Sequence, residues 1–116
     1  MAFVKITRPI SNCTYPVMTL FLIGDGRQAC VRLSSGCRDH ALKLGFCALD
    51  SEYDPDRGEC RFVAGTEIST ARKQVQSGMT GTFLLRRGWR RGRYTARLMP
   101  DGVYVSQSDR IDKEGT

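Results

Sequence analysis

The pattern of apolar and polar residues predicts short β-strands joined by tight turns. Residues 17–23 are apolar on both faces of a strand, as in a central strand that is covered on each side. Residues 3–8 alternate between apolar and polar side chains and predict a further strand. Glycine and proline supply the backbone angles that hairpin turns need. Three such turns separate apolar runs: Asp25-Gly26, Pro55 to Gly58, and Pro100 to Gly102.

A helical period replaces this alternation at residues 34–45, where Ser34 or Ser35 can cap the start and Gly45 suits the end. One face of this helix carries Cys37, His40, Ala41 and Leu44. Residues 66–78 predict a second short helix. The expected fold is therefore α+β: an antiparallel sheet of about six or seven strands built from hairpins, with one or two short helices packed on it.

The chain has 116 residues, which is the size of one domain, and we expect that domain to span residues 1–107. Residues 108–116 have little to bury and are expected to form a flexible tail. The longest apolar run, residues 17–23, is far shorter than the ~20 residues of a membrane-spanning helix. The N-terminus also lacks the features of a secretory signal. These features predict a cytoplasmic protein with no membrane association.

Charge is distributed unevenly along the chain, which has a net charge of +6. Residues 1–67 contain eight basic and eight acidic side chains, and residues 101–116 contain four acidic and two basic ones. Residues 68–100 contain eight basic side chains and no acidic one. Such segregation is typical of a protein that binds a polyanion.

The basic segment, residues 84–98, predicts an arginine-rich hairpin with strands over residues 82–87 and 93–99. Its tip would expose Trp89, Arg90 and Arg91, while Phe83, Leu85, Tyr94, Ala96 and Leu98 would point to the core. Arginine donates two parallel hydrogen bonds to phosphate, and tryptophan can stack on a base or wedge between base steps. The candidate nucleic-acid-binding residues are Arg72, Lys73, Arg86, Arg87, Trp89, Arg90, Arg91, Arg93 and Arg97.

These residues predict a small, non-enzymatic protein that contacts the phosphate backbone of DNA or RNA. That interpretation would fail if the chain's own Asp and Glu residues already occupied the arginines and the indole were packed inside. The alternative is an interaction or inhibitor protein that docks on a nucleic-acid-handling enzyme, and in size and texture the chain is similar to accessory proteins of phages and other mobile elements. A third interpretation is a solvated edge strand. Exposed sheet edges would also allow a homodimer.

Metal and cofactor chemistry has weak support in the sequence. The spacing of Cys30, Cys37, His40 and Cys47 is loose for zinc, and the acidic residues 50–59 fit a hairpin turn better than a calcium loop. His40, on the inward helix face, is expected to be a satisfied boundary histidine. The five cysteines form no C-x-x-C pair and are expected to be reduced and mostly buried. We therefore expect no metal, no cofactor and no catalytic residue.

Overall fold

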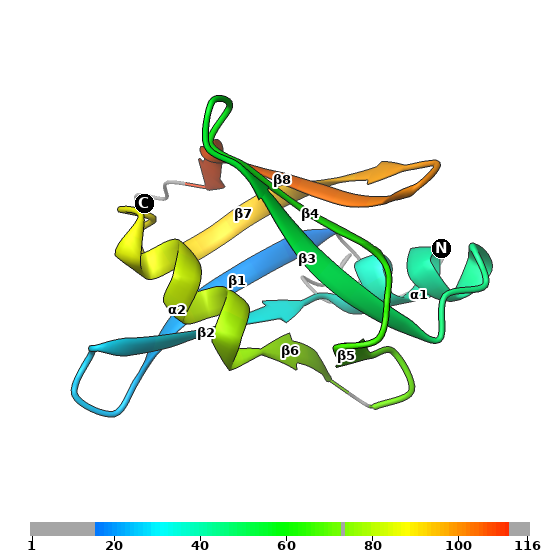
Figure 1. Ribbon diagram of the computed structural model, residues 1–116, viewed down its shortest axis with the longest axis horizontal. Coiled ribbons are helices and arrows are strands. Elements are labelled where there is room, and N and C mark those ends of the chain that lie inside the picture. Colours follow the sequence, from blue (N-terminus) through cyan, green and yellow to red (C-terminus); the bar gives the residue numbers. More distant parts are fainter. Residues whose placement is uncertain (1–15, 73, 112–116) are drawn as a thin grey trace, which may run out of the picture.

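An antiparallel sheet of eight strands and two short helices makes up the computed structural model, which describes residues 16–72 and 74–111 (Figure 1). The strands are β1 (Val17–Ile23), β2 (Gln28–Leu33), β3 (Ala48–Asp54), β4 (Glu59–Ala64), β5 (Ile68–Ser69), β6 (Val75–Ser77), β7 (Gly92–Met99) and β8 (Gly102–Ile111). The helices are α1 (Ser35–Lys43) and α2 (Gly78–Arg86). The predicted α+β class is confirmed, with slightly more strands than expected.

The strands follow the order β5-β3-β4-β8-β7-β1-β2-β6. The two edge strands, β5 and β6, approach each other, so the sheet curls and nearly closes into a barrel (Figure 1). The three predicted hairpins are confirmed, because β1 pairs with β2, β3 with β4, and β7 with β8. The strand predicted at residues 3–8 lies outside the described residues.

Helix α1 confirms the helix expected at residues 34–45. It begins after Ser34 and ends before Gly45, whose φ of +84° is an angle that glycine adopts at no steric cost. Cys37 and Ala41 are fully buried on its inner face. His40 is satisfied as expected, because its Nε2 lies 2.7 Å from the carbonyl oxygen of Met99.

The second predicted helix, over residues 66–78, is wrong. This segment forms the short strands β5 and β6 with a bend between them. Thr70, in the bend, is 1% exposed, and its hydroxyl lies 2.9 Å and 2.8 Å from the carbonyl oxygens of Phe46 and Cys47. Ile68 and Val75 are buried, so β-branched side chains fix an extended segment where a helix was expected.

The strand predicted at residues 82–87 is also wrong, because these residues belong to α2 and the turn that follows it. Ser77 caps the helix and accepts a hydrogen bond from the Thr80 amide at 3.1 Å. Gly81 lets the helix approach β2 so closely that a Cβ atom there would lie 2.5 Å from the Cα of Cys30. Tertiary contact with β2 thus supports a helix that contains two glycines.

Side-chain hydrogen bonds attach the first half of α2 to the sheet on two sides. The Thr82 hydroxyl bonds both the amide and the carbonyl group of Ala29 in β2, each at 3.2 Å. The hydroxyls of Ser51 in β3 and Thr80 in α2 lie 2.7 Å apart. The helix therefore bridges β2 and β3 and covers the inside of the curled sheet (Figure 1).

The core lies between α2 and the inner face of the sheet. Its largest fully buried side chains are Trp89, Tyr94, Phe62, Met18, Leu20, Leu49 and Leu84. Tyr94 and Ala96 point inward as predicted, but Leu98 is 42% exposed and Phe83 is 38% exposed. Strand β8 continues to Ile111, four residues into the segment that was expected to be a tail. Across residues 16–72 and 74–111, neither helix is long and apolar enough to cross a membrane.

Candidate nucleic-acid interface

Five arginines surround the end of α2 and the start of β7, and we call them the terminal arginine cluster: Arg86, Arg87, Arg90, Arg91 and Arg93. The first four residues are exposed and Arg93 is half-buried. Gly88 ends the helix with a φ of +88°, which turns the chain toward β7. The cluster therefore lies on a helix end and a turn, and not on the predicted hairpin.

Side chains from β8 hold this turn in place. The guanidinium group of Arg110 donates two hydrogen bonds to the carbonyl oxygen of Arg91, at 3.0 Å and 2.9 Å. The side-chain amide of Gln107 donates to the carbonyl oxygen of Gly88 at 3.2 Å. Sequence reasoning missed Arg110 because its segment was assigned to a tail. These bonds use backbone carbonyls, so they fix the turn and leave the side chain of Arg91 exposed.

Trp89 does not lie at an exposed tip, and that prediction is wrong. It is 1% exposed, and its ring packs 5.1 Å from the ring of Tyr94 and 6.5 Å from that of Tyr53. An indole buries a large apolar area, which outweighs the attraction of the neighbouring charges for solvent. Among the described residues, its Nε1 has no hydrogen-bond partner. Trp89 supports the turn from inside and is not available to stack on a base.

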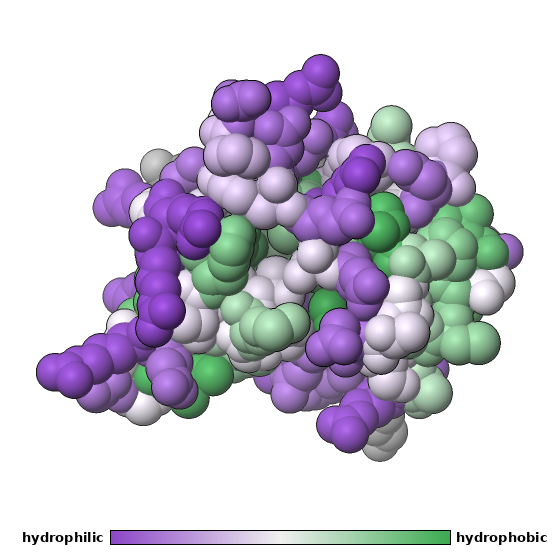
Figure 2. Space-filling model, viewed as in Figure 1, coloured by the Kyte–Doolittle hydropathy of each residue, from purple (hydrophilic) through white to green (hydrophobic). Residues whose placement is uncertain are grey.

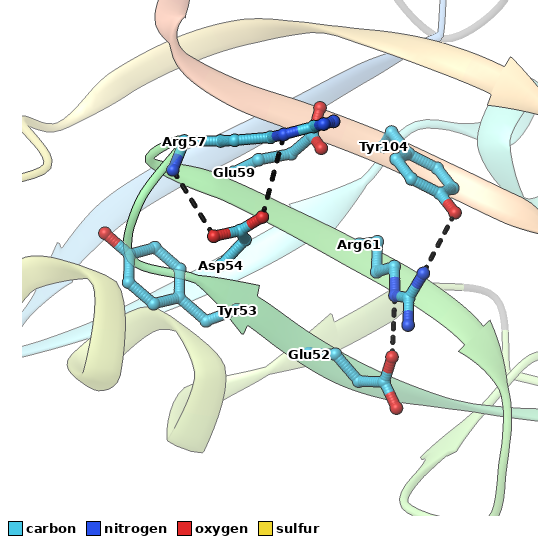
Figure 3. A pocket seen from close by; sticks show the side chains of 7 residues that line it. All are labelled: Glu52, Tyr53, Asp54, Arg57, Glu59, Arg61 and Tyr104. Atoms are coloured by element: carbon cyan, nitrogen blue, oxygen red, sulfur yellow. Dashed lines mark hydrogen bonds and ion pairs between the residues drawn. The ribbon is translucent and has the colours of Figure 1, made fainter.

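Arg97 belongs to a different part of the surface. It forms an ion pair with Glu59 on the outer face of the sheet. Beside this pair, Arg61 lies 2.6 Å from Glu52, and its guanidinium donates to the Tyr104 hydroxyl at 3.2 Å. Figure 3 shows Glu52, Glu59, Arg61 and Tyr104 along a groove over β3, β4 and β8. The acidic turn therefore neutralises one of the predicted phosphate-binding arginines.

The remaining predicted residues are not part of the cluster. Arg72 is exposed in the connection between β5 and β6, which points to the opposite side of the molecule from the end of α2 (Figure 1). Lys73 lies outside the described residues. Five of the nine predicted residues are thus brought together by the fold.

Arginines of the cluster form no ion pair within the part of the chain that the structure describes. The four ion pairs there are Arg27–Asp25, Arg57–Asp54, Arg61–Glu52 and Arg97–Glu59. Arg86, in the last turn of α2, also faces the negative end of the helix dipole, which favours a cation. The helix dipole can account for one or two positive charges at the end of α2, but not for five.

An aromatic pair lies next to the cluster, and sequence reasoning missed it. The guanidinium carbon of Arg87 lies 3.5 Å from the ring centre of Phe83 and 5.7 Å from that of Tyr53. The two rings meet edge to face, with their centres 5.4 Å apart. Met79, Phe83 and Arg87 are spaced four residues apart, so they share one helix face. That spacing is visible in the sequence only when the segment is treated as a helix.

Other chemistry-bearing residues have structural partners. Asp50 accepts hydrogen bonds from the amides of Thr66 and Glu67 at 2.9 Å and 3.1 Å. Burial raises the pKa of the Cys37 thiol to about 11 and that of Cys60 to about 12, so both are protonated at neutral pH. Within residues 16–72 and 74–111, no group of three or more His, Cys, Asp or Glu side chains could hold a metal ion.

Comparison with known proteins adds no relative. No family model matches the sequence, and no curated protein or solved structure matches the chain. The function is therefore argued from the geometry of the site.

Proposed function

We propose that the protein binds the phosphate backbone of nucleic acid through the terminal arginine cluster and has no catalytic activity of its own. One observation carries this proposal: five arginines gather where α2 ends and β7 begins, and no described carboxylate pairs with any of them. Elsewhere in the described chain, four arginines have a carboxylate partner: Arg27, Arg57, Arg61 and Arg97. Two others bond neutral groups instead, Arg32 the side chain of Gln76 and Arg38 the carbonyl oxygen of Thr70.

The physical reason is the cost of leaving like charges together. Charges within a Debye length, about 8 Å at physiological salt, repel one another, and phosphates would relieve that repulsion. Guanidinium groups suit phosphate because their planar fork donates two parallel hydrogen bonds. The fixed turn also limits the entropy that binding would cost, since its backbone is already held by Arg110 and Gln107.

Counterion release gives a quantitative expectation. If all five arginines contact phosphates, the logarithm of the association constant should fall with the logarithm of salt concentration at a slope of about −4.5 on duplex DNA and about −3.5 on a single strand. A ligand held by apolar contact alone would show almost no slope.

The test compares two double variants that remove the same charge. Arg90→Gln/Arg91→Gln removes two of the five charges of the cluster and leaves in place the backbone carbonyls that Tyr94 and Arg110 bond. Arg27→Gln/Arg57→Gln removes two exposed arginines that have carboxylate partners elsewhere. We expect the first variant to lose at least tenfold in affinity and about two units of salt slope, and the second to stay near the unaltered protein.

Two results would contradict the proposal. One is the absence of salt-dependent binding to any DNA or RNA, single- or double-stranded. The other is an equal loss of affinity in both double variants, because net charge and not the cluster would then explain binding. A stoichiometric protein captured from nuclease-treated lysate, together with no binding to nucleic acid, would favour the docking of this surface on a protein.

A further inference from the structure

We infer that this surface takes single-stranded nucleic acid, with an unpaired base seated against Phe83 and Tyr53 and phosphates on the adjoining arginines. The inference rests on the proposed function and adds that the bound nucleic acid is single-stranded. Its evidence is a groove beside the cluster that phosphate binding alone does not require.

The exposed face of α2 changes from apolar to basic along its length. Met79 is 64% exposed and Phe83 is 38% exposed, and Arg86 and Arg87 follow at the end of the same face. Figure 2 shows hydrophobic side chains on the surface over α2, with strongly hydrophilic side chains beside them. A strand lying along this face would meet aromatic surface and positive charge in succession.

The groove lies between α2 and the strands that face it. Met79, Thr80 and Phe83 form one side, and Ser51, Tyr53 and Cys60 form the other. The groove is open to solvent and has a volume of about 190 Å³. The Ser51 and Thr80 hydroxyls bond each other at 2.7 Å, so these two hydroxyls are already used. Glu52 also lines the groove, and its carboxylate is paired with Arg61. These walls fit a flat, weakly polar group such as the face of a base.

Arg87 connects the groove to the cluster. Its guanidinium lies over the Phe83 ring at 3.5 Å and donates to the carbonyl oxygen of Phe83 at 3.4 Å. Unpaired bases stack on aromatic rings and on guanidinium planes, while the flanking phosphates bind cations. Because the guanidinium covers one face of the Phe83 ring, a base would stack on the guanidinium itself or on the part of the ring that Arg87 leaves exposed.

The preference for single-stranded over double-stranded nucleic acid follows from which parts of the ligand can reach the groove and the arginines. A duplex exposes its phosphates, so it can contact the arginines, but its bases are paired and stacked and cannot enter the groove without being flipped out. An unpaired strand can use both halves at once. The basic end of the helix face distinguishes this occupant from an apolar protein segment, because an apolar segment would leave four exposed arginines without a partner.

The test measures binding of fluorescently labelled oligothymidylate, an abasic strand with the same number of phosphates, and a duplex of equal length. We expect the protein to bind oligothymidylate at least tenfold more tightly than the abasic strand or the duplex, since one stacked base contributes about that factor. Phe83→Leu keeps an apolar side chain and removes the ring, and it should abolish most of this preference.

Tyr104→Leu is the matched control. Tyr104 also lies near two arginines, with its ring centre 5.9 Å from the guanidinium carbons of both Arg61 and Arg97, but it is on the outer face of the sheet. This variant should bind all three ligands as the unaltered protein does. Circular dichroism and thermal unfolding would confirm that both variants fold.

The outcomes separate this inference from the proposed function. Equal affinity for oligothymidylate and the abasic strand, with loss of both in Arg90→Gln/Arg91→Gln, would overturn base stacking and leave phosphate binding in place. Tighter binding to the duplex would overturn the inference in the same way. No binding to any of the three ligands, or capture of a protein that depends on Phe83 in the absence of nucleic acid, would overturn both.

Discussion

Replacing Gly81 with alanine should separate α2 from the sheet. An added Cβ atom would lie 2.5 Å from the Cα of Cys30, 2.6 Å from its amide nitrogen and 2.7 Å from the carbonyl carbon of Ala29. All three are backbone atoms of β2, so no side-chain rotation can relieve the overlap. An ordinary carbon–carbon contact is about 3.5–4.0 Å, so the helix would have to move by roughly 1 Å.

The size of the effect follows from three contributions. Overpacking at such a contact costs about 1–3 kcal/mol. A shift of the helix would also weaken the two hydrogen bonds between Thr82 and Ala29, each worth about 1 kcal/mol. Alanine would also stabilise the helix by about 1 kcal/mol, because it is a better helix former than glycine. The free energy of unfolding should therefore fall by about 2 kcal/mol, out of a total of about 5–15 kcal/mol for a domain.

Gly78→Ala is the control, since it makes the same chemical change in the same helix. A Cβ atom there would have only the carbonyl oxygen of Ala29 near it, at 4.0 Å. This variant should be as stable as the unaltered protein or more stable by up to about 1 kcal/mol. Because Gly81→Ala also displaces the end of α2, it should weaken nucleic-acid binding, and Gly78→Ala should not.

Urea unfolding followed by fluorescence of the single, buried Trp89 measures these differences as shifts of the transition midpoint. If Gly81→Ala were as stable as Gly78→Ala, the close packing of α2 on β2 would be refuted, and with it the reason that residues 82–86 are helical.

Three further predictions concern buried and exposed groups. Because burial raises the pKa of the Cys37 thiol to about 11 and that of Cys60 to about 12, the unfolded state loses these protons first as pH rises. The free energy of unfolding should therefore be unaffected below the ordinary thiol pKa of about 8.5. Above that pH it should fall by up to about 1.4 kcal/mol per pH unit for each thiol. An unchanged midpoint of urea unfolding between neutral pH and about pH 10 would contradict this. Cys47 is exposed, so among the four described cysteines we expect it to react first with iodoacetamide. Peptide mass mapping would show the order of labelling, and faster labelling of Cys37 or Cys60 would contradict their burial. Trp89 should emit at short wavelength and resist quenching by acrylamide both with and without bound oligonucleotide; quenching by the oligonucleotide at saturation would place the indole in the interface.

Local sequence signals were sufficient where a few neighbouring residues decide the structure. The turns at Gly26, Gly58 and Gly102 and the helix ending at Gly45 could be predicted because glycine permits, and proline fixes, the backbone angles that turns and helix ends need. The segment at residues 82–87 could not, because its apolar residues fit a strand as well as a helix. Its state depends on contact between Gly81 and β2, which are distant in sequence.

The candidate site was predicted in part for the same reason. The segregation of charge identified the arginines, and five of them do lie together at the end of α2. Pairing of Arg97 with Glu59 depends on the register of β4, β8 and β7, which composition does not reveal. Burial of Trp89 depends on the turn at Gly88 and on Tyr53 and Tyr94, which surround the indole. The aromatic surface beside the arginines comes from Phe83, which the strand interpretation placed in the core.

The near-closure of the sheet has a consequence for how copies of this chain meet at high concentration. In the described part of the chain, its edge strands β5 and β6 are two and three residues long, and α2 is bonded to β2 and β3 beyond them, at Ala29 and Ser51. A second copy would therefore find little uncovered backbone to pair with. Long, flat edges recruit further strands and start cross-β assembly, and brief edges avoid it. Partially unfolded chains in which β5 and β6 have separated, and not the native form, would then be the species that begins fibre growth.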